Sequence, residues 1–113
     1  MRLLGDDGKV HRLETDYVIG SEPVSLPGNA RALRLHGNVA GISRHHVLVS
    51  PVGSRLRVTD LGSTNGTYLL FPDSVHLRLV EPGESVEIPS GTQIKLAKRS
   101  FYYEFLGDVT KAA

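Results

Sequence analysis

The chain has 113 residues, enough for one domain with its own core, and it has no cysteine, which excludes disulfides, zinc–thiolate sites and a cysteine nucleophile. Its formal net charge of +1 argues against binding nucleic acid. Acidic residues near the N-terminus, such as Asp6 and Asp7, argue against a signal peptide. No apolar run approaches the roughly 20 residues of a membrane span. We therefore expect a single domain over residues 1–113, located in the cytoplasm, that neither inserts into a membrane nor binds nucleic acid.

Short apolar or alternating runs, separated by Gly- and Pro-containing turns, recur along the whole chain and leave little room for long helices. In chain order, the expected strands are residues 2–4, 10–13, 17–19, 32–35, 46–49, 56–58, 67–71, 75–79, 86–88, 94–96 and 101–106. Turn signals at intervals of about 8–12 residues are typical of sandwiches and barrels. The pattern predicts an all-β fold, an antiparallel β-sandwich of about eleven short strands.

The turns between these strands have clear signals. Asp6–Gly8 is predicted to join the first two strands as a hairpin, and Pro51–Ser54 to separate two later strands. Glu81–Glu84 and Pro89–Gly91 are predicted to close further hairpins, with proline at the second turn position. One long connection runs from Gly20 to about Ala30, and it is either a functional loop or a surface insertion.

Charge is unevenly distributed along the chain. Between Pro23 and Thr59 there is no Asp or Glu, although this stretch contains several basic side chains. They are Arg31, Arg34, Arg44, Arg55 and Arg57, together with His36, His45 and His46. The pattern favours a positively biased end of the molecule that attracts an anion, with chance placement on a solvated surface as the alternative.

Two segments, Gly41–His46 (G-I-S-R-H-H) and Asp60–Thr67 (D-L-G-S-T-N-G-T), combine hydroxyl, amide and small residues where turns are expected. Asp60 can cap the second turn, and its glycines allow positive φ at the corners. Such turns expose backbone N–H groups and short donors, which suit an oxyanion. One such turn alone is explained by internal hydrogen bonding, but two of them together with the charge bias favour anion recognition.

Catalytic, metal and nucleotide sites are poorly supported. Ser63 does not lie in a G-x-S-x-G turn and no helix follows it, which argues against a hydrolase triad. The adjacent His45 and His46 point to opposite faces of an extended chain and cannot bind one metal ion. The glycines around Asn65 lack the following helix of a nucleotide-binding loop. We expect no enzyme activity, no metal and no cofactor.

The chain resembles forkhead-associated domains, small β-sandwiches that bind phosphothreonine peptides. The resemblance rests on Tyr17–Gly20, on Ser43–His46 and on Asp60–Leu69, in matching order and spacing, and the flanking strands extend it over nearly the whole chain. It implies a phosphothreonine-peptide recognition module of a Ser/Thr-kinase-linked signalling or assembly system, with recognition loops at one end of the sandwich. The implied partner is a phosphothreonine-containing protein or peptide, and we expect the isolated domain to be monomeric.

The resemblance also implies roles for individual residues. The Ser43 hydroxyl would donate to the phosphate, the backbone N–H or guanidinium of Arg44 would face the same anion, and Thr64 would contact it. Asn65 would hydrogen-bond the peptide backbone and hold it extended across the loop tips. The implied phosphopeptide-binding set is completed by Ser63 and Ser21.

Other residues are implied to support the site. His46 would tie the two loops together from beneath, Gly62 and Gly66 would set loop shape, and Gly20 would end a strand at the rim of the site. In the family, a side chain two residues before the serine often helps to select the residue three positions after the phosphothreonine. That position is Gly41 here, so this selectivity is either weak or supplied from elsewhere.

One departure from the family pattern concerns charge. The family usually has arginine directly after the glycine matched by Gly20, whereas this chain has Ser21. Losing a charge-assisted hydrogen bond at an anion site costs on the order of 1.5–3 kcal/mol. Arg31 or Arg34, which follow the long connection, are possible substitutes. The alternative is a scaffold of the same fold that binds a protein partner independently of phosphate.

Overall fold

A computed structural model describes residues 1–24 and 26–107, which form eleven strands. The strands are β1 (Arg2–Gly5), β2 (Val10–Arg12), β3 (Tyr17–Gly20), β4 (Arg31–Arg34), β5 (Val47–Val52), β6 (Arg55–Asp60), β7 (Thr67–Leu70), β8 (Arg78–Val80), β9 (Ser85–Ile88), β10 (Gln93–Leu96) and β11 (Arg99–Glu104). Within the described ranges, no helix has the length and apolar character needed to cross a bilayer. The prediction of an all-β fold with about eleven strands is confirmed.

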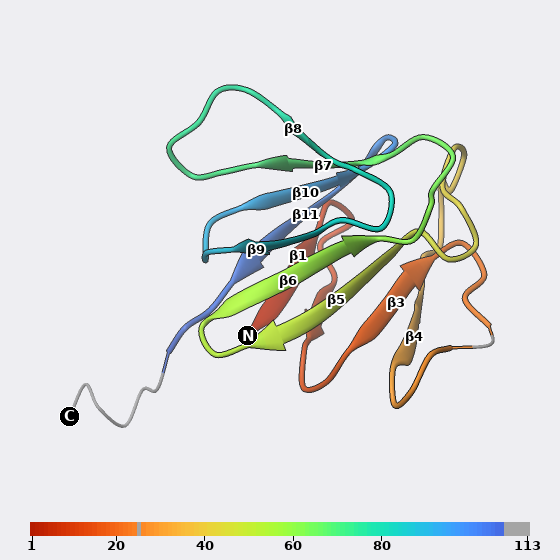
Figure 1. Ribbon diagram of the computed structural model, residues 1–113, viewed down its shortest axis with the longest axis horizontal. Helices are drawn as coiled ribbons and strands as arrows, with labels where there is room; N and C mark the ends of the chain where they lie inside the picture. The colour runs from red at the N-terminus through yellow and green to blue at the C-terminus, as the bar shows by residue number, and fades with distance from the viewer. Residues whose placement is uncertain (25, 108–113) are drawn as a thin grey trace.

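Two sheets make up the sandwich (Figure 1). The strand order is β2-β1-β11-β10-β7-β8 in the six-stranded sheet and β4-β3-β5-β6-β9 in the five-stranded sheet. Paired strands are antiparallel except for β3 and β4, which are parallel, so the expectation of a wholly antiparallel sandwich is wrong at this pair. Parallel neighbours need a crossover of about a dozen residues, and the long connection over residues 21–30 is of that length.

Two predicted strands have an end that lies three residues from its position in the structure, whereas the other strand ends agree within two residues. Only Arg78 and Leu79 of the predicted strand 75–79 pair, within β8, because Ser74 and His76 form a local turn through the Ser74 hydroxyl. β5 continues through Pro51 and Val52, so only Gly53–Ser54 forms the turn to β6. Proline is tolerated in β5 because the pairing with β3 ends at Val49, which leaves the nitrogen of Pro51 without a strand to face.

The Asp6–Gly8 hairpin is confirmed by the pairing of β1 with β2, but the other two predicted hairpins are wrong. Glu81–Glu84 and Pro89–Gly91 each carry the chain between sheets, since β8 and β10 lie in one sheet and β9 in the other. The first is a turn with Pro82 at its second position, whereas the second begins at Pro89 itself, whose carbonyl accepts from the Thr92 N–H (3.3 Å). Turn residues specify a reversal of the chain but not the pairing partner.

The core lies between the sheets and consists of alternate side chains from both of them. The fully buried members include Leu3, Ile19, Val47, Val49, Leu56, Val58, Leu69, Ile88, Ile94, Leu96 and Tyr103. A one-residue slip of any central strand would expose its apolar set, so this core holds the register of the strands. The register places the segments 35–46 and 60–67 at the same end of the sandwich, as predicted (Figure 1).

The turn between β10 and β11 contains Ala97, which has a φ of 54° and is the one non-glycine residue with positive φ in the described ranges. This conformation costs an L-residue about 1–2 kcal/mol. Ala97→Gly should therefore raise the free energy of unfolding by about 0.5–1 kcal/mol, after allowance for the greater entropy of the unfolded chain. Urea denaturation measures the change.

The matched control is Ala32→Gly, because Ala32 is exposed and extended in β4. It should lower the free energy of unfolding by about 0.5–1 kcal/mol. Loss of stability in both variants would contradict the interpretation that the backbone at Ala97 is strained.

Candidate functional site

The end of β3 lies directly against the Ser43–Arg44 backbone. A Cβ atom on Gly20 would lie 1.8 Å from the Arg44 carbonyl oxygen and 2.8 Å from that of Ser43. Any side chain at Gly20 would therefore displace the segment that carries Ser43. The next residue continues the contact, because the Ser21 N–H donates to the Ser43 carbonyl (3.0 Å). Gly20 and Ser21 thus form one rim of the site.

The ring of His46 joins the two motif loops and is completely buried. Its Nδ1 accepts from the Ser43 N–H (3.1 Å), and its Nε2 donates to the Gly66 carbonyl (2.8 Å). These two bonds place the ring proton on Nε2. His45 points the other way, and its Nε2 contacts the backbone of Val24 in the long connection. The two histidines therefore serve different loops.

The loop over residues 60–67 is organised by the buried carboxylate of Asp60. One of its oxygens accepts from the backbone N–H groups of Gly62 and Ser63 (both 3.0 Å), and the other from the hydroxyls of Ser63 (2.6 Å) and Thr67 (2.7 Å). Burial acts to raise the pKa of Asp60, but these hydrogen bonds outweigh it and hold the pKa below its ordinary value. Asp60 is therefore ionised at neutral pH.

The hydroxyl of Ser63 is used inside this loop. It donates to Asp60 and accepts from the Gly66 N–H (3.0 Å), while Gly62 and Gly66 both adopt positive φ. Sequence reasoning assigns Ser63 to ligand contact, whereas its hydrogen bonds stabilise the loop. The neighbouring Thr64 and Asn65 are exposed at the tip.

Ser43, Thr64 and Asn65 meet at a shallow hollow of about 200 Å³, which Gly41 and Ile42 also line. The Thr64 N–H donates to Ser43 Oγ (3.0 Å), so the hydroxyl hydrogen of Ser43 remains available to an acceptor outside. Asn65 donates one Nδ2 hydrogen to the Gly41 carbonyl (2.9 Å). Its Oδ1 and its second N–H remain available to a ligand.

Gly41 has little space for a side chain. Its φ is +80°, and a Cβ atom there would lie 3.1 Å from Asn65 Nδ2 and 3.2 Å from the Cβ of Ala97. The β10–β11 turn therefore packs beside the hollow and brings the exposed Lys98 to this end of the molecule. Any selectivity on this side must come from residues other than Gly41.

The strand register separates the two predicted substitute arginines. Arg34 lies beside Gly20 at the rim, whereas Arg31 lies beside Tyr17, three residues or about 10 Å further along the sheet. Arg44 is exposed beside Ser43, and among the described residues neither Arg34 nor Arg44 forms an ion pair. Glu22 lies on the same rim, because its N–H donates to the Arg44 carbonyl (3.4 Å).

Sequence reasoning missed Arg99, a buried arginine at the start of β11. Its Nη1 donates to the carbonyls of His36 (2.6 Å) and Asn38 (3.2 Å), and its Nε to the Asp6 carboxylate (3.1 Å). It thereby anchors the segment that leads into Gly41 and Ser43. No local signal identifies it, because these partners, and Asp7 at 3.5 Å from Nη2, lie far away in the sequence and Ala-Lys-Arg resembles an ordinary surface turn.

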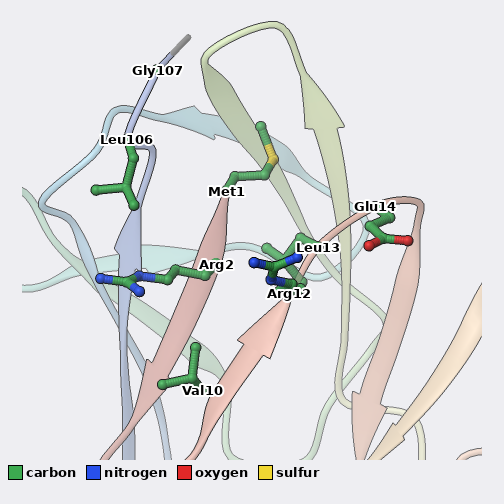
Figure 2. Close-up of a pocket in the computed structure, with 8 residues that line it drawn as sticks. All are labelled: Met1, Arg2, Val10, Arg12, Leu13, Glu14, Leu106 and Gly107. Carbon is green, nitrogen blue, oxygen red and sulfur yellow. The ribbon is translucent and has the colours of Figure 1, made fainter. Parts of the chain in front are cut away.

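A larger hollow, of about 340 Å³, lies at the opposite end of the six-stranded sheet (Figure 2). Arg2, Arg12 and Leu106 are among its lining residues, and Arg2 is paired with Glu104 (2.6 Å). It is separated from Ser43 by the length of the strands. Across the part of the chain that the structure describes, no three His, Asp or Glu side chains gather in a way that could hold a metal ion.

Comparisons with known proteins agree with this geometry. Residues 17–97 match the family model described as FHA domain, whereas no curated protein matches the sequence. The FHA domain of human APLF, in complex with an XRCC1 bisphospho peptide, has 19% identity and a TM-score of 0.69, with 93% of this chain and 97% of that chain covered.

Two further solved structures are similar over nearly their whole length. The FhaA FHA domain, complexed with the intracellular domain of Rv3910, has 26% identity and a TM-score of 0.62, with 89% of this chain and 96% of that chain covered. The FHA domain of CT664 from Chlamydia trachomatis has 20% identity and a TM-score of 0.67, with 93% and 99% covered.

The role of Asp60 in shaping the loop predicts a pH dependence. At neutral pH, Asp60→Asn should lower the free energy of unfolding by about 2–3 kcal/mol, because the amide offers fewer acceptor sites to the four donors. The pKa of the folded state lies below the ordinary value of 3.8, so the stabilisation by Asp60 is complete above that pH and is lost as the pH falls below it.

Urea unfolding of both proteins at a series of pH values measures the effect. The difference in stability between wild type and Asp60→Asn should shrink as the pH falls from about 4 to about 2. A difference that stays constant over this range would show that the charge of Asp60 does not stabilise the loop.

Proposed function

Because the chain belongs to the forkhead-associated (FHA) family, we propose that it is a phosphothreonine-peptide recognition module of a Ser/Thr-kinase-linked signalling or assembly system, and not an enzyme. The observation that carries the proposal is the meeting of Ser43, Thr64 and Asn65 at one hollow. His46 ties Ser43 to Gly66, the Thr64 N–H donates to Ser43, and Asn65 donates to Gly41. We also propose that residues 1–113 form one domain, monomeric in isolation, that needs no cofactor.

In this proposal the phosphate lies over the contact between Ser43 and Thr64. The Ser43 hydroxyl donates to a phosphate oxygen, since its lone pair already accepts from the Thr64 N–H. Arg44 adds its exposed guanidinium or its backbone N–H. Ile42 also lines the hollow, and its side chain offers an apolar neighbour to the methyl group of phosphothreonine.

Asn65 holds the peptide in an extended conformation. One of its N–H groups is committed to Gly41, which fixes the orientation of the amide. The remaining N–H and Oδ1 can then pair with a carbonyl and an N–H of a peptide backbone. Recognition by fixed loop tips reduces the entropy lost on binding, because little of the site needs to become ordered.

The charge at the rim bears on the choice between a phosphate-binding module and a scaffold that does not bind phosphate. Ser21 supplies no charge, and we infer that Arg34 replaces the missing arginine, because it lies beside Gly20 in the register of β3 and β4. The alternative function is a scaffold that binds its partner independently of phosphate. The neutral Ser21 and the acidic Glu22, both on the rim, favour that alternative.

Binding of phosphothreonine peptides, measured by calorimetry beside phosphoserine and unmodified copies, tests the main proposal. Phosphothreonine should bind most tightly, and Asn65→Ala should weaken this binding about tenfold through lost backbone hydrogen bonds. The melting temperature of Asn65→Ala should change little, because Asn65 is exposed. Equal affinity for phosphorylated and unmodified peptides would support the scaffold instead.

The source of the positive charge is tested by two matched alanine substitutions in β4. Arg34→Ala should weaken phosphopeptide binding about 10- to 100-fold through the loss of a charge-assisted hydrogen bond. Arg31→Ala should leave it unchanged, because Arg31 lies about 10 Å further along the sheet.

Ser21→Arg tests the same assignment by adding a positively charged side chain at the rim. Because Arg34 already supplies the charge in this proposal, the new arginine should add little to the binding of the phosphorylated peptide. A large gain from Ser21→Arg that shrinks with added salt, or equal effects of Arg31→Ala and Arg34→Ala, would contradict the assignment of Arg34.

A further inference from the structure

The segment over residues 36–41 follows β4 and belongs to neither sheet. Among the described residues, the hydrogen bonds that join this segment to distant parts of the chain come from two side chains, Arg99 and Asn65. Asn65 Nδ2 donates to the Gly41 carbonyl (2.9 Å). Two earlier carbonyls accept from Arg99 Nη1, those of His36 (2.6 Å) and Asn38 (3.2 Å). The segment therefore lies between a buried arginine and a residue of the proposed binding site.

The guanidinium of Arg99 is held on its other side by the turn between β1 and β2. The Arg99 side chain is 8% exposed, its Nε donates to the Asp6 carboxylate (3.1 Å), and Asp7 lies 3.5 Å from Nη2. The second oxygen of Asp6 accepts from the Ser100 N–H (3.0 Å), which fixes this carboxylate on β11. A charge buried to this extent needs such partners. Contacts thus run from the β1–β2 turn through Arg99 to residues 36–41.

Ser43 and Asn65 differ in what fixes their positions. Ser43 is held by its own backbone, because its N–H and its carbonyl are both hydrogen-bonded to residues outside the segment 36–41. Asn65 is exposed, and within the described ranges the bond to the Gly41 carbonyl is the one hydrogen bond that orients its amide. The place of that carbonyl depends on the segment that Arg99 holds. A loss of Arg99 should therefore affect Asn65 and leave Ser43 in place.

We propose that Arg99 is a positioning residue for peptide recognition, which orients the Asn65 amide through residues 36–41. The inference rests on the proposed function and deepens it, because it names a buried residue away from the ligand that sets the affinity of the same site. Val39 packs against the core, so the segment stays attached without Arg99 and loses only its defined conformation. Binding then costs more conformational entropy, because Asn65 must be ordered by the ligand.

A double-mutant cycle, measured by calorimetry with a phosphothreonine peptide that has alanine at its flanking positions, tests the proposal. Arg99→Lys keeps the charge but removes the planar fork that serves two carbonyls and a carboxylate at once. It should weaken binding about three- to tenfold, because it can remove at most the roughly tenfold contribution of Asn65. In the Asn65→Ala protein, Arg99→Lys should weaken binding no further. A purely structural role of Arg99 would give equal losses in both proteins.

The matched control is Arg2→Lys, because Arg2 pairs with Glu104 (2.6 Å) at the opposite end of the same sheet. It should leave the affinity unchanged. Should Arg99→Lys fail to fold, Asp6→Asn takes its place in the cycle, because Asp6 is partly exposed and its charge holds the Arg99 fork. Asp6→Asn should weaken binding about two- to threefold in the wild type and not in Asn65→Ala.

The NMR signals of the Asn65 side-chain NH2 group give a second measurement, which needs no ligand. Arg99→Lys should move them towards the chemical shifts of a freely solvated amide, whereas Arg2→Lys should leave them unchanged. Unmoved Asn65 signals in Arg99→Lys, or equal losses of affinity in both proteins of the cycle, would overturn the inference, and the phosphopeptide proposal would stand. If the wild type binds no phosphothreonine peptide, both proposals fail.

Discussion

The site depends on one buried imidazole. His46 accepts the Ser43 N–H with one ring nitrogen and donates to the Gly66 carbonyl with the other, so a single side chain connects the two loops. Each of these backbone groups would cost about 1–3 kcal/mol if it were buried without a partner. No other residue type has a donor and an acceptor on opposite sides of a rigid ring. The geometry of the rim therefore follows from the tautomer of this histidine.

Two further buried charges fix the loops on either side of His46. Asp60 gathers four donors of the 60–67 loop, and Arg99 holds two carbonyls of the segment before Gly41. Charges of this kind are costly to bury unless their hydrogen bonds are satisfied, and here they are. The result is a pair of loops ordered before any ligand binds, which is favourable for recognition by short side chains and backbone groups.

The rim carries less positive charge than the motif pattern leads one to expect. Ser21 is neutral and Glu22 is acidic, and in the proposed site the charge offered to a phosphate comes from Arg44 beside Ser43 and Arg34 beside Gly20. Affinity in such a site relies more on hydrogen-bond geometry and on contacts outside the phosphate.

The sequence by itself determined the all-β class and the strand count, because alternation, turn residues and spacing are local properties. The position of the two motif loops at one end was implied by the resemblance of their motifs to forkhead-associated domains. The sequence also indicated that Asp60 caps its loop and that His45 and His46 point in different directions. It could not determine that β3 and β4 run parallel, or that the turns at Pro82 and Pro89 cross between sheets, since a turn does not specify its pairing partner. Only the tertiary structure separated Arg34 from Arg31, buried Arg99 under the loop and placed Asn65 against the Gly41 carbonyl. Each of these depends on contacts between residues far apart in the chain, and such contacts are set by the packing of the whole core and not by any local pattern.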